Sequence, residues 1–511
     1  MKKIVLVPLD ERPCNHVFPE QLTAISDFTL VKAPMHLLGN KKVPAKVEEL
    51  WEWLYEEIQD ADCAVLSIDM LLYGGIVPSR LHTMNETECR NHFNRISKLK
   101  ELNPSLTVYT FHLIMRCPSY SSSDEEPDYY EDWGREIFRY GFIKHKQTLN
   151  LADDSEVEEL TEIQQRLPKE YLDDYLNRRK KNTQVNQAAV DLVAQGAIDF
   201  HIIPQDDAAP YGLTVQDQQL VRSYVQEKEV LLKVFMYPGA DEVANVLITR
   251  FINKENEYVP KVYPRYSSVH GPNVIPKYED RPFGETLKYQ IMAAGGILVD
   301  SEPESNIVLL INSPGEDMME ASQQNDQIRG YEVFRNITEL AEYGDYVIKS
   351  LKKPCAVADI AFANGGDLQF IKLLKQKEIL FELSGYAGWN TSSNTLGTVI
   401  PHSMLTSFYG RNEAHLTFLS LRFVEDAGYC GQIRRKVCDQ YLPEMGHTYM
   451  KVDGQTGEVA VLVKRELEAF IQKELEYDNH RVLIDFCYMP WSRMFEVGLS
   501  LSYSESVAVR K

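Results

Sequence analysis

The chain has 511 residues, of which 44% are hydrophobic and 25% are charged, a composition that is typical of globular proteins and excludes intrinsic disorder. Asp and Glu outnumber Lys and Arg by 75 to 54, and the resulting formal net charge of −21 argues against a nucleic-acid partner because it repels polyphosphate. No apolar run approaches the roughly 18 residues of a membrane helix, so we expect no membrane partner either.

The cysteines and the N-terminus both bear on the compartment. The eight cysteines are spread along the chain and form no C-x-x-C pair with zinc or redox spacing, so we interpret them as isolated thiols. Pro8 and Asp10 come before any apolar run that is long enough for the core of a signal peptide. The sequence therefore predicts a cytoplasmic location with reduced cysteines.

Short apolar runs alternate along the chain with stretches that are long enough for helices, which indicates an α/β fold. Most of these runs are continuously apolar, as is typical of strands that are covered on both faces in a parallel sheet or barrel. We predict strands at residues 3–8, 28–32, 63–68, 107–115, 200–204, 230–237, 306–311, 355–358 and 379–384.

Helices are predicted between these strands, most clearly at residues 43–59 and 86–102. The stretch 155–195 is rich in Glu, Lys, Arg and Gln and is longer than one crossover needs. We therefore expect a helical insertion near residues 118–198 that packs over the strand ends. Within it, residues 118–132 have loop composition, either a solvated surface loop or an active-site lid.

The C-terminal part has a different pattern, with helices predicted at residues 402–441 and 458–475 and two strands within 481–502. We accordingly divide the chain into an α/β catalytic domain, residues 1–400, and an α+β cap, residues 401–511. The predicted fold class is α/β with a parallel (β/α) barrel or barrel-like sheet.

Charged, amide and aromatic side chains follow the predicted strands. Because the carboxyl ends of parallel strands form one rim, these side chains are expected to converge there on a ligand. Asp and Asn also cap helices after such strands, which is the structural alternative for any one of them. The residues that we predict to bind substrate are Asp10, Arg12, Asp69, Arg80, Arg116, Asp241, Asn364, Trp389 and Asn390.

Asp206 and Asp207 form the most informative pair, directly after the strand predicted at residues 200–204. Two adjacent carboxylates repel each other, so one should have a raised pKa, as acid–base catalysis requires. The alternative is that Asp207 caps a helix while Asp206 is exposed. Asp241 and Glu242 present the same choice, with a structural role favoured because an acid suits a first helical turn.

Several well-marked sites are absent. The sequence has no dinucleotide or ATP phosphate loop in the required strand-to-helix context, no G-x-S-x-G elbow and no H-E-x-x-H helix. A hard cation could take oxygen ligands from several aspartates, but no compact ligand motif supports a metal, and we predict neither metal nor cofactor. His112 and His201 lie inside apolar strands and are interpreted as core residues. The aspartates considered as ligands are Asp10, Asp69, Asp206, Asp241 and Asp359.

The segment 385–397 combines Tyr386 and Trp389 with two asparagines and several hydroxyl groups. Aromatic faces stack on the apolar faces of sugar rings, while amides pair with sugar hydroxyls. The alternative is a tight loop that closes the core, with Trp389 as a buried plug.

Four motifs resemble those of a bacterial family of about the same length whose function is unknown. They are PLDERP at residues 8–13, SIDMLLYGG at 67–75, QDDAAP at 205–210 and GYAGWNT at 385–391. The resemblance covers essentially the whole chain and implies no activity.

A second, local resemblance concerns residues 200–207, which are similar to the catalytic pair of β-N-acetylglucosaminidases that use substrate-assisted catalysis on a (β/α)8 barrel. In that family the first carboxylate orients the substrate acetamido group and the second is the general acid and base. The resemblance implies the first role for Asp206 and the second for Asp207, although the flanking residues differ from that family.

These observations together predict a glycoside hydrolase that acts on a small sugar, with N-acetylated and acidic sugars among the candidates, through Asp206 and Asp207. One alternative is a divalent-metal-dependent hydrolase or lyase that uses the same aspartates. The other is a cytoplasmic sugar-binding or regulatory protein without catalysis. The expected partner is a small carbohydrate, and a homo-oligomer is left open.

Overall fold

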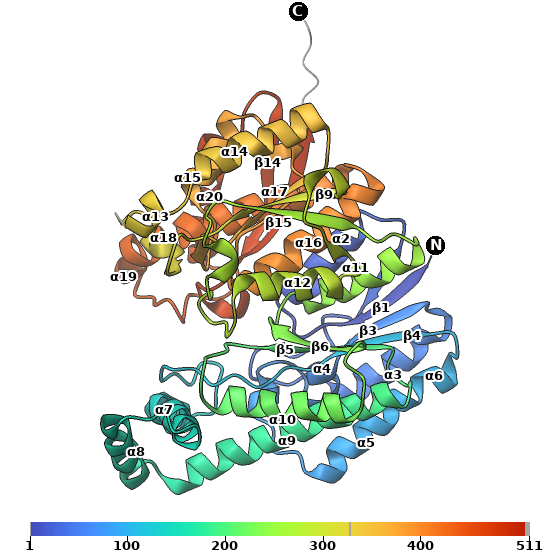
Figure 1. Cartoon of the computed structure of the whole chain (residues 1–511), viewed down its shortest axis with the longest axis vertical. Coiled ribbons are helices and arrows are strands. Elements are labelled where there is room, and N and C mark those ends of the chain that lie inside the picture. Colours follow the sequence, from blue (N-terminus) through green and yellow to red (C-terminus); the bar gives the residue numbers. More distant parts are fainter. Residues whose placement is uncertain (1, 327–328, 506–511) are drawn as a thin grey trace, which may run out of the picture. The chain divides into compact units, whose positions relative to one another are not determined.

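The computed structural model describes residues 2–326 and 329–505, and the chain divides into two compact units (Figure 1). Unit 1 comprises Met1–Glu11, Thr29–Ala244 and Tyr278–Asp280. Unit 2 comprises Arg12–Phe28, Asn245–Lys277 and Arg281–Lys511. The chain therefore crosses between the units more than once.

Unit 1 is built on a six-stranded parallel sheet with the strand order β2-β1-β3-β4-β5-β6. Most of its strands are buried along nearly their whole length, which explains why their sequences are continuously apolar. The strands are β1 (Lys3–Val7), β2 (Thr29–Lys32), β3 (Cys63–Ser67), β4 (Thr107–Phe111), β5 (Phe200–Gln205) and β6 (Val234–Pro238).

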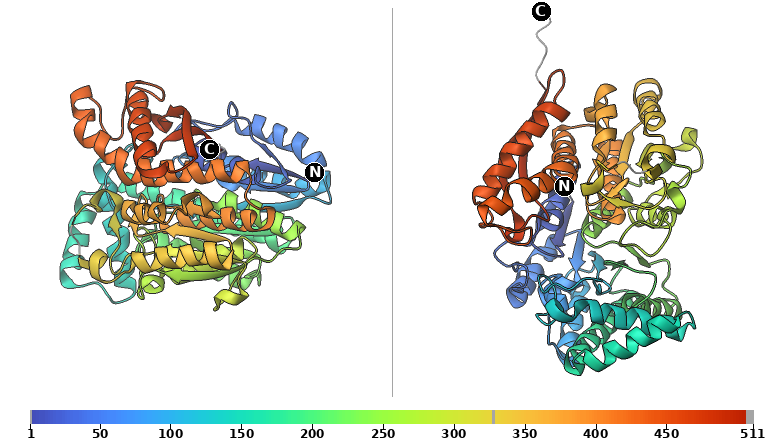
Figure 2. Two further views of the ribbon diagram at one scale, coloured as in Figure 1. Left: turned by 90° about the horizontal axis from the view of Figure 1, so that it is seen from above. Right: turned by 90° about the vertical axis from the view of Figure 1, so that its left-hand side faces the viewer.

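Helices connect these strands, and α5, α9 and α10 run side by side along one face of the sheet (Figures 1 and 2). Three helices, α7 to α9, separate β4 from β5 in the chain, where the sequence predicts a helical insertion. The helices are α3 (Val47–Glu57), α4 (Ile68–Tyr73), α5 (Glu86–Ser97), α6 (Leu99–Leu102), α7 (Tyr130–Thr148), α8 (Asp154–Arg166), α9 (Lys169–Ala194) and α10 (Leu213–Glu227), with short 3-10 turns η1 (Ile58–Asp60) and η2 (Pro78–Arg80).

Helix α3 shows how the sequence fixes this packing. Leu50, Trp51 and Leu54 recur at helical spacing and are all buried against the core of unit 1. The indole Nε1 of Trp51 also donates a hydrogen bond to the carbonyl of Leu71, 3.1 Å away, which satisfies its polar atom inside the core.

Unit 2 contains a five-stranded parallel sheet with the order β13-β11-β9-β7-β8 and two smaller sheets. The five strands are β7 (Lys261–Tyr266), β8 (Ile297–Leu298), β9 (Ile307–Asn312), β11 (Cys355–Asp359) and β13 (Gly385–Ala387). Strands β10 (Met319–Glu320) and β12 (Phe362–Ala363) form a parallel pair, and β14 (His480–Tyr488) and β15 (Gly498–Glu505) form an antiparallel hairpin.

The helices of unit 2 include three π-helical segments, which are uncommon and occur often at functional sites. These are η6 (Val347–Leu351), η8 (Phe423–Ile433) and η9 (Ile471–Leu475). The other helices, with α11 crossing from unit 1 into unit 2, are α1 (Pro13–His16), α2 (Phe18–Thr23), α11 (Val243–Glu255), α12 (Phe283–Ala293), α13 (Arg329–Val333), α14 (Ile337–Tyr346), α15 (Leu368–Gln376), α16 (Ser392–Tyr409), α17 (Glu413–Arg422), α18 (Arg434–Gln440), α19 (Leu442–Met445) and α20 (Glu458–Phe470). Short 3-10 turns complete the unit at η3 (Gly271–Asn273), η4 (Glu302–Glu304), η5 (Ala321–Gln323), η7 (Leu380–Glu382) and η10 (Pro490–Ser492).

The predicted α/β class with parallel strands is confirmed, whereas the barrel and the domain boundary at residue 400 stay predictions. The strand predicted at residues 379–384 is wrong, because the buried Leu380 and Phe381 belong to a 3-10 turn and the strand begins at Gly385. A short apolar run does not distinguish a strand from a buried turn. The sequence also missed β7, whose Lys261, Pro264 and Arg265 break the apolar pattern.

Two further sequence predictions concern the whole chain. No disulfide joins any two of the eight cysteines. Among the residues that the structure describes, none of the helices is both long enough and apolar enough to cross a membrane.

We expect Leu54→Ala to lower the free energy of unfolding by about 2–5 kcal/mol, because Leu54 is completely buried and its removal leaves a cavity in the core of unit 1. Urea denaturation measures this loss. Leu102→Ala is the matched control, since Leu102 is half exposed and its truncation should cost about 0.5 kcal/mol or less. Equal losses in the two variants would contradict the packing described for α3.

Candidate functional site

A cluster of two arginines and four carboxylates lies at the carboxyl ends of the strands of unit 1. Asp206 and Asp207 directly follow β5, Arg116 follows β4, and Arg80 ends the turn η2 that comes after β3. Glu125 and Glu126 come from the segment that precedes α7 and contact both arginines. Three stretches that are distant in the sequence, at residues 80, 116–126 and 206–207, therefore meet at one edge of the parallel sheet.

Arg80 holds one end of this cluster. Its NH2 group lies 2.8 Å from Oδ2 of Asp206. Its NH1 group lies 2.9 Å from Oε2 of Glu125 and 3.5 Å from Oε1 of Glu126. The Arg80 side chain is only 3% exposed, so these ion pairs form away from bulk water and each retains more of its strength than a surface pair.

Arg116 holds the other end. Its NH1 group lies 3.2 Å from Oδ2 of Asp207, and its NH2 group lies 3.2 Å from Oε2 of Glu125. Its Nε donates a hydrogen bond to Oε1 of Glu126 at 2.8 Å. The two glutamates thus bridge both arginines, whereas each aspartate contacts one.

The electrostatics of the cluster favour a proton on the aspartate pair. Burial raises the pKa of Asp206, the charge of Asp207 raises it further, and the positive charges of Arg80 and Arg116 lower it. Burial likewise raises the pKa of Asp207, against the opposing charges of the same two arginines. Because ionisation of Asp207 disfavours ionisation of Asp206, the two aspartates lose their protons in successive steps, and the second proton is lost at a higher pH than from an isolated aspartate.

The backbone and exposure of the pair distinguish its two members. Asp207 adopts a left-handed conformation with φ of 37°, which is uncommon outside glycine and costs backbone energy. Its side chain is 27% exposed, compared with 13% for Asp206. None of the described residues donates a hydrogen bond to Oδ1 of either aspartate. These oxygens are therefore available to a ligand.

The helix-capping alternative for Asp207 is wrong, because Gly212 occupies the N-cap position of α10. Glu125 and Glu126 were not predicted as site residues from the sequence, although both lie in the segment 118–132. The Glu126 side chain is 1% exposed, so this part of the segment is packed into the cluster rather than solvated. The sequence signal that could have identified these two glutamates is that they form an adjacent acidic pair in a loop that covers two arginines.

The other predicted residues of unit 1 are also buried. Asp69 accepts a hydrogen bond from the backbone N–H of Leu113 at 3.1 Å, and its Oδ1 lies 3.7 Å from Nε2 of His112. Burial raises the pKa of Asp69, while the charge of His112 acts in the opposite direction. Asp10 and Asp241 are 1% and 5% exposed.

The predicted core histidines of unit 1 are both fully buried. His201 contacts the hydroxyl of Thr110 at 2.7 Å, and burial lowers the pKa of His201 to about 3, so its imidazole is neutral.

The remaining predicted residues belong to unit 2, where they line a small cavity of about 20 Å³, room for about one water molecule. Trp389 is 8% exposed, and its Nε1 donates a hydrogen bond to the hydroxyl of Thr398 at 3.1 Å. This is the geometry of a loop that closes the core. A role in substrate binding stays a prediction for these four residues, which are Arg12, Asn364, Trp389 and Asn390.

Unit 2 has its own buried acid at a strand end. Asp359, the last residue of β11, accepts hydrogen bonds from the Tyr386 hydroxyl at 2.9 Å, the Asp367 backbone N–H at 2.8 Å and the Asn312 amide at 2.9 Å. Burial, followed by the charge of Asp367, raises the pKa of Asp359 to about 7. No group of three or more His, Cys, Asp or Glu side chains is arranged to hold a metal within residues 2–326 and 329–505.

Comparison with known proteins establishes the family. Residues 4–500 match the family described as "Protein of unknown function (DUF4127)", and the chain belongs to it. This confirms the predicted resemblance to a family of unknown function. A comparison with curated proteins found no match. The local resemblance to β-N-acetylglucosaminidases stays a prediction.

We expect Arg80→Met to destabilise the protein by about 3–5 kcal/mol, because it leaves buried carboxylates without their cation. Arg435→Met is the matched control, since Arg435 and its partner Asp439 are both exposed and such a pair contributes about 0.5 kcal/mol. Urea denaturation compares the two variants. A loss of less than about 1 kcal/mol for Arg80→Met would contradict the proposed stabilisation of the cluster by this arginine.

The raised pKa of Asp359 predicts a pH dependence of stability. The folded state holds this proton up to about pH 7, whereas the unfolded chain loses it near the ordinary value of 3.8, so the contribution to stability is lost as pH rises from about 4 to 7. The loss is at most about 1.4 kcal/mol per pH unit for one group.

Urea denaturation at several pH values between 4 and 7 tests this dependence. Asp359→Asn should weaken the fall in stability with rising pH, whereas Asp485→Asn, at an exposed position on β14, should keep the slope of the wild type. Equal slopes for all three proteins would contradict a proton held on Asp359.

Proposed function

We propose that this member of a family without an assigned activity is a glycoside hydrolase, with Asp207 as general acid and base and Asp206 as the orienting carboxylate. One observation carries the proposal: two adjacent, partly buried carboxylates with raised pKa values are anchored by arginines through one oxygen each, and neither Oδ1 accepts a hydrogen bond from the described residues. Glycosidases require such a pair, in which one group holds a proton that the other does not.

Exposure and geometry support this assignment of roles. Asp207 is the more accessible carboxylate, so it is the member of the pair that can pass the shared proton to the glycosidic oxygen of a bound sugar. Asp206 is the more enclosed, and its pairing with Arg80 fixes the carboxylate so that it can orient a substrate hydroxyl or acetamido group. The proposal requires only the parallel six-stranded sheet and does not depend on the predicted barrel.

The charge of the cluster favours a neutral sugar over an acidic one. Arg80 and Arg116 face four carboxylates, so their positive charges are already compensated before substrate binds. An acidic sugar would bring a further negative charge to a site that has no excess of cations. The cytoplasmic location belongs to the same proposal and is supported by eight cysteines that form no disulfide with one another.

The test is turnover of a panel of aryl glycosides, neutral, N-acetylated and uronic, by the wild type and Asp207→Asn. We expect a neutral or N-acetylated glycoside to be hydrolysed, with kcat/KM about 10²- to 10⁴-fold lower in the variant. The loss should be greatest for poor leaving groups such as phenol and smallest for dinitrophenol, because a good leaving group needs little protonation. The kcat/KM of the wild type should fall at high pH as the aspartate pair loses its remaining proton.

Two controls sharpen this experiment. Asp154→Asn alters an exposed residue of α8 and should leave kcat/KM unchanged. Activity should also persist in excess EDTA, whereas an absolute metal requirement would favour the alternative of a metal-dependent hydrolase or lyase. The proposal is wrong if the wild type turns over none of the glycosides, or if Asp207→Asn matches it.

A further inference from the structure

Unit 2 contains a large open cavity at the carboxyl end of its five-stranded sheet, with a volume of about 1050 Å³. Ser267, in its wall, directly follows β7, and Asp367 follows the β11–β12 segment. The side-chain amide of Asn312, the last residue of β9, donates a hydrogen bond to Oδ2 of Asp367 at 3.2 Å. Open parallel sheets bind their ligands in this position, and the volume is at the upper end of the range for ligand sites.

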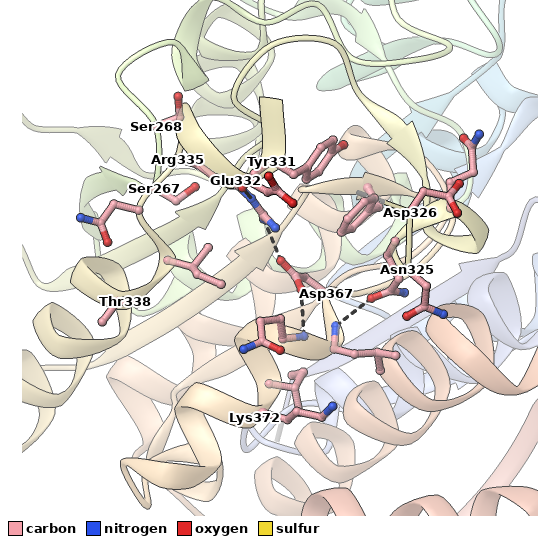
Figure 3. Close-up of a pocket in the computed structure, with 18 of the residues that line it drawn as sticks. Ser267, Ser268, Asn325, Asp326, Tyr331, Glu332, Arg335, Thr338, Asp367 and Lys372 are labelled. Atoms are coloured by element: carbon pink, nitrogen blue, oxygen red, sulfur yellow. Dashed lines mark hydrogen bonds and ion pairs between the residues drawn. The ribbon is translucent and has the colours of Figure 1, made fainter. Parts of the chain in front are cut away.

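One arginine that lines the cavity, Arg335, is fixed by hydrogen bonds and has a donor group available to a ligand. The NH1 group of Arg335 donates hydrogen bonds to Oδ2 of Asp367 at 2.7 Å and to Oδ1 of Asn312 at 3.2 Å, and its Nε donates to the carbonyl of Tyr331 at 3.1 Å. Figure 3 shows its guanidinium directed at the Asp367 carboxylate. None of the described residues accepts a hydrogen bond from its NH2 group. The guanidinium is thus held rigidly with one donor group free.

The charges of the lining do not favour a charged ligand. Because acidic and basic side chains nearly balance, the cavity has no net field that would select a phosphate or a carboxylate. The basic side chains are Arg335, Lys372 and Lys473, and the acidic ones are Asp326, Glu332, Asp367 and Glu474.

The uncharged groups of the lining suit hydroxyl groups. Three carboxamides and one hydroxyl form no hydrogen bond with the described residues, and each offers both a donor and an acceptor, as sugar hydroxyls do. Phe334 adds a half-buried aromatic ring of the kind on which the apolar face of a sugar packs. The four polar residues are Asn325, Thr338, Gln369 and Gln432.

Irregular helices supply part of the same wall. Gln432 lies in the π-helix η8, and Lys473 and Glu474 lie in the π-helix η9. Such segments cost stability relative to a regular α-helix and are retained most often where they position functional groups. Two of them at one cavity are a second, independent indication of a ligand site.

We propose that this cavity is a binding site for a neutral oligosaccharide, with the free NH2 group of Arg335 and the carboxamides of Gln369 and Gln432 as donors and acceptors to its hydroxyl groups. The site is separate from the Asp206–Asp207 pair, and the inference does not rest on the proposed function, because it concerns binding without turnover.

The test is isothermal titration calorimetry of the full chain with cellotetraose, maltotetraose, chitotetraose and inorganic phosphate as probes. At least one of the three sugars should bind saturably, and Gln369→Ala should weaken its Kd about 3- to 10-fold by removing hydrogen bonds. Gln376→Ala is the matched control, because Gln376 is exposed on the same helix, α15, outside the cavity, and should leave Kd unchanged.

The same titration with Asp207→Asn separates this proposal from the glycosidase proposal. The Kd should be unchanged in that variant, whether or not the wild type shows turnover. Binding that is lost in Asp207→Asn but kept in Gln369→Ala would place the sugar in unit 1 and overturn this inference. It would also be overturned if none of the sugars bound, or if only phosphate bound.

Discussion

The pairing of four carboxylates, one buried and three partly buried, with two guanidinium groups is the interaction on which the candidate site depends. Water stabilises an isolated carboxylate far better than a protein interior does, so the cluster exists only because Arg80 and Arg116 replace that water. The two arginines repel each other, and Glu125 and Glu126 offset this repulsion because each contacts both of them.

The geometry of the cluster assigns different roles to its acids. The glutamates lie between the arginines, where their removal would leave like charges side by side, so they act as structural bridges. Asp206 and Asp207 lie at the two ends, where each uses one oxygen for an arginine and keeps the other open. The same arrangement that stabilises the fold therefore leaves the aspartates as the groups that can carry chemistry.

Much of unit 1 could be predicted from the sequence because its strands are buried on both faces and read as uninterrupted apolar runs. The pair Asp206–Asp207 and the arginines Arg80 and Arg116 could be assigned to one rim from parallel topology alone. Their glutamate partners could not, since residues 118–132 have loop composition and nothing in that composition shows that Glu126 is buried. Strand β7 of unit 2 was missed because it is only partly buried, and Lys261 and Arg265 interrupt its apolar pattern.

The cavity of unit 2 could not be predicted from the sequence, for a different reason. Its cavity is built from turns, helix starts and π-helices, and none of these has a periodicity that places residues such as Gln369 and Gln432 on one wall. Trp389, which the sequence offered as a stacking surface, is packed against Phe18 with ring centroids 5.8 Å apart, and its role in substrate binding stays a prediction. An aromatic residue in a polar loop closes a core as readily as it binds a sugar, and only its burial separates the two.

The two parallel sheets end in acids that are stabilised in different ways, and the difference has chemical consequences. Asp206 and Asp207 face cations that oppose the rise in their pKa values, so the pair stays able to exchange a proton with a ligand. Asp359 relies on neutral donors, including the Tyr386 hydroxyl, and is completely enclosed, which suits a structural proton more than a transferable one. Acids at the carboxyl edge of a sheet therefore need not share a role. Reaction chemistry is expected of Asp206 and Asp207, because each keeps a carboxylate oxygen that a ligand can contact, and not of the enclosed Asp359.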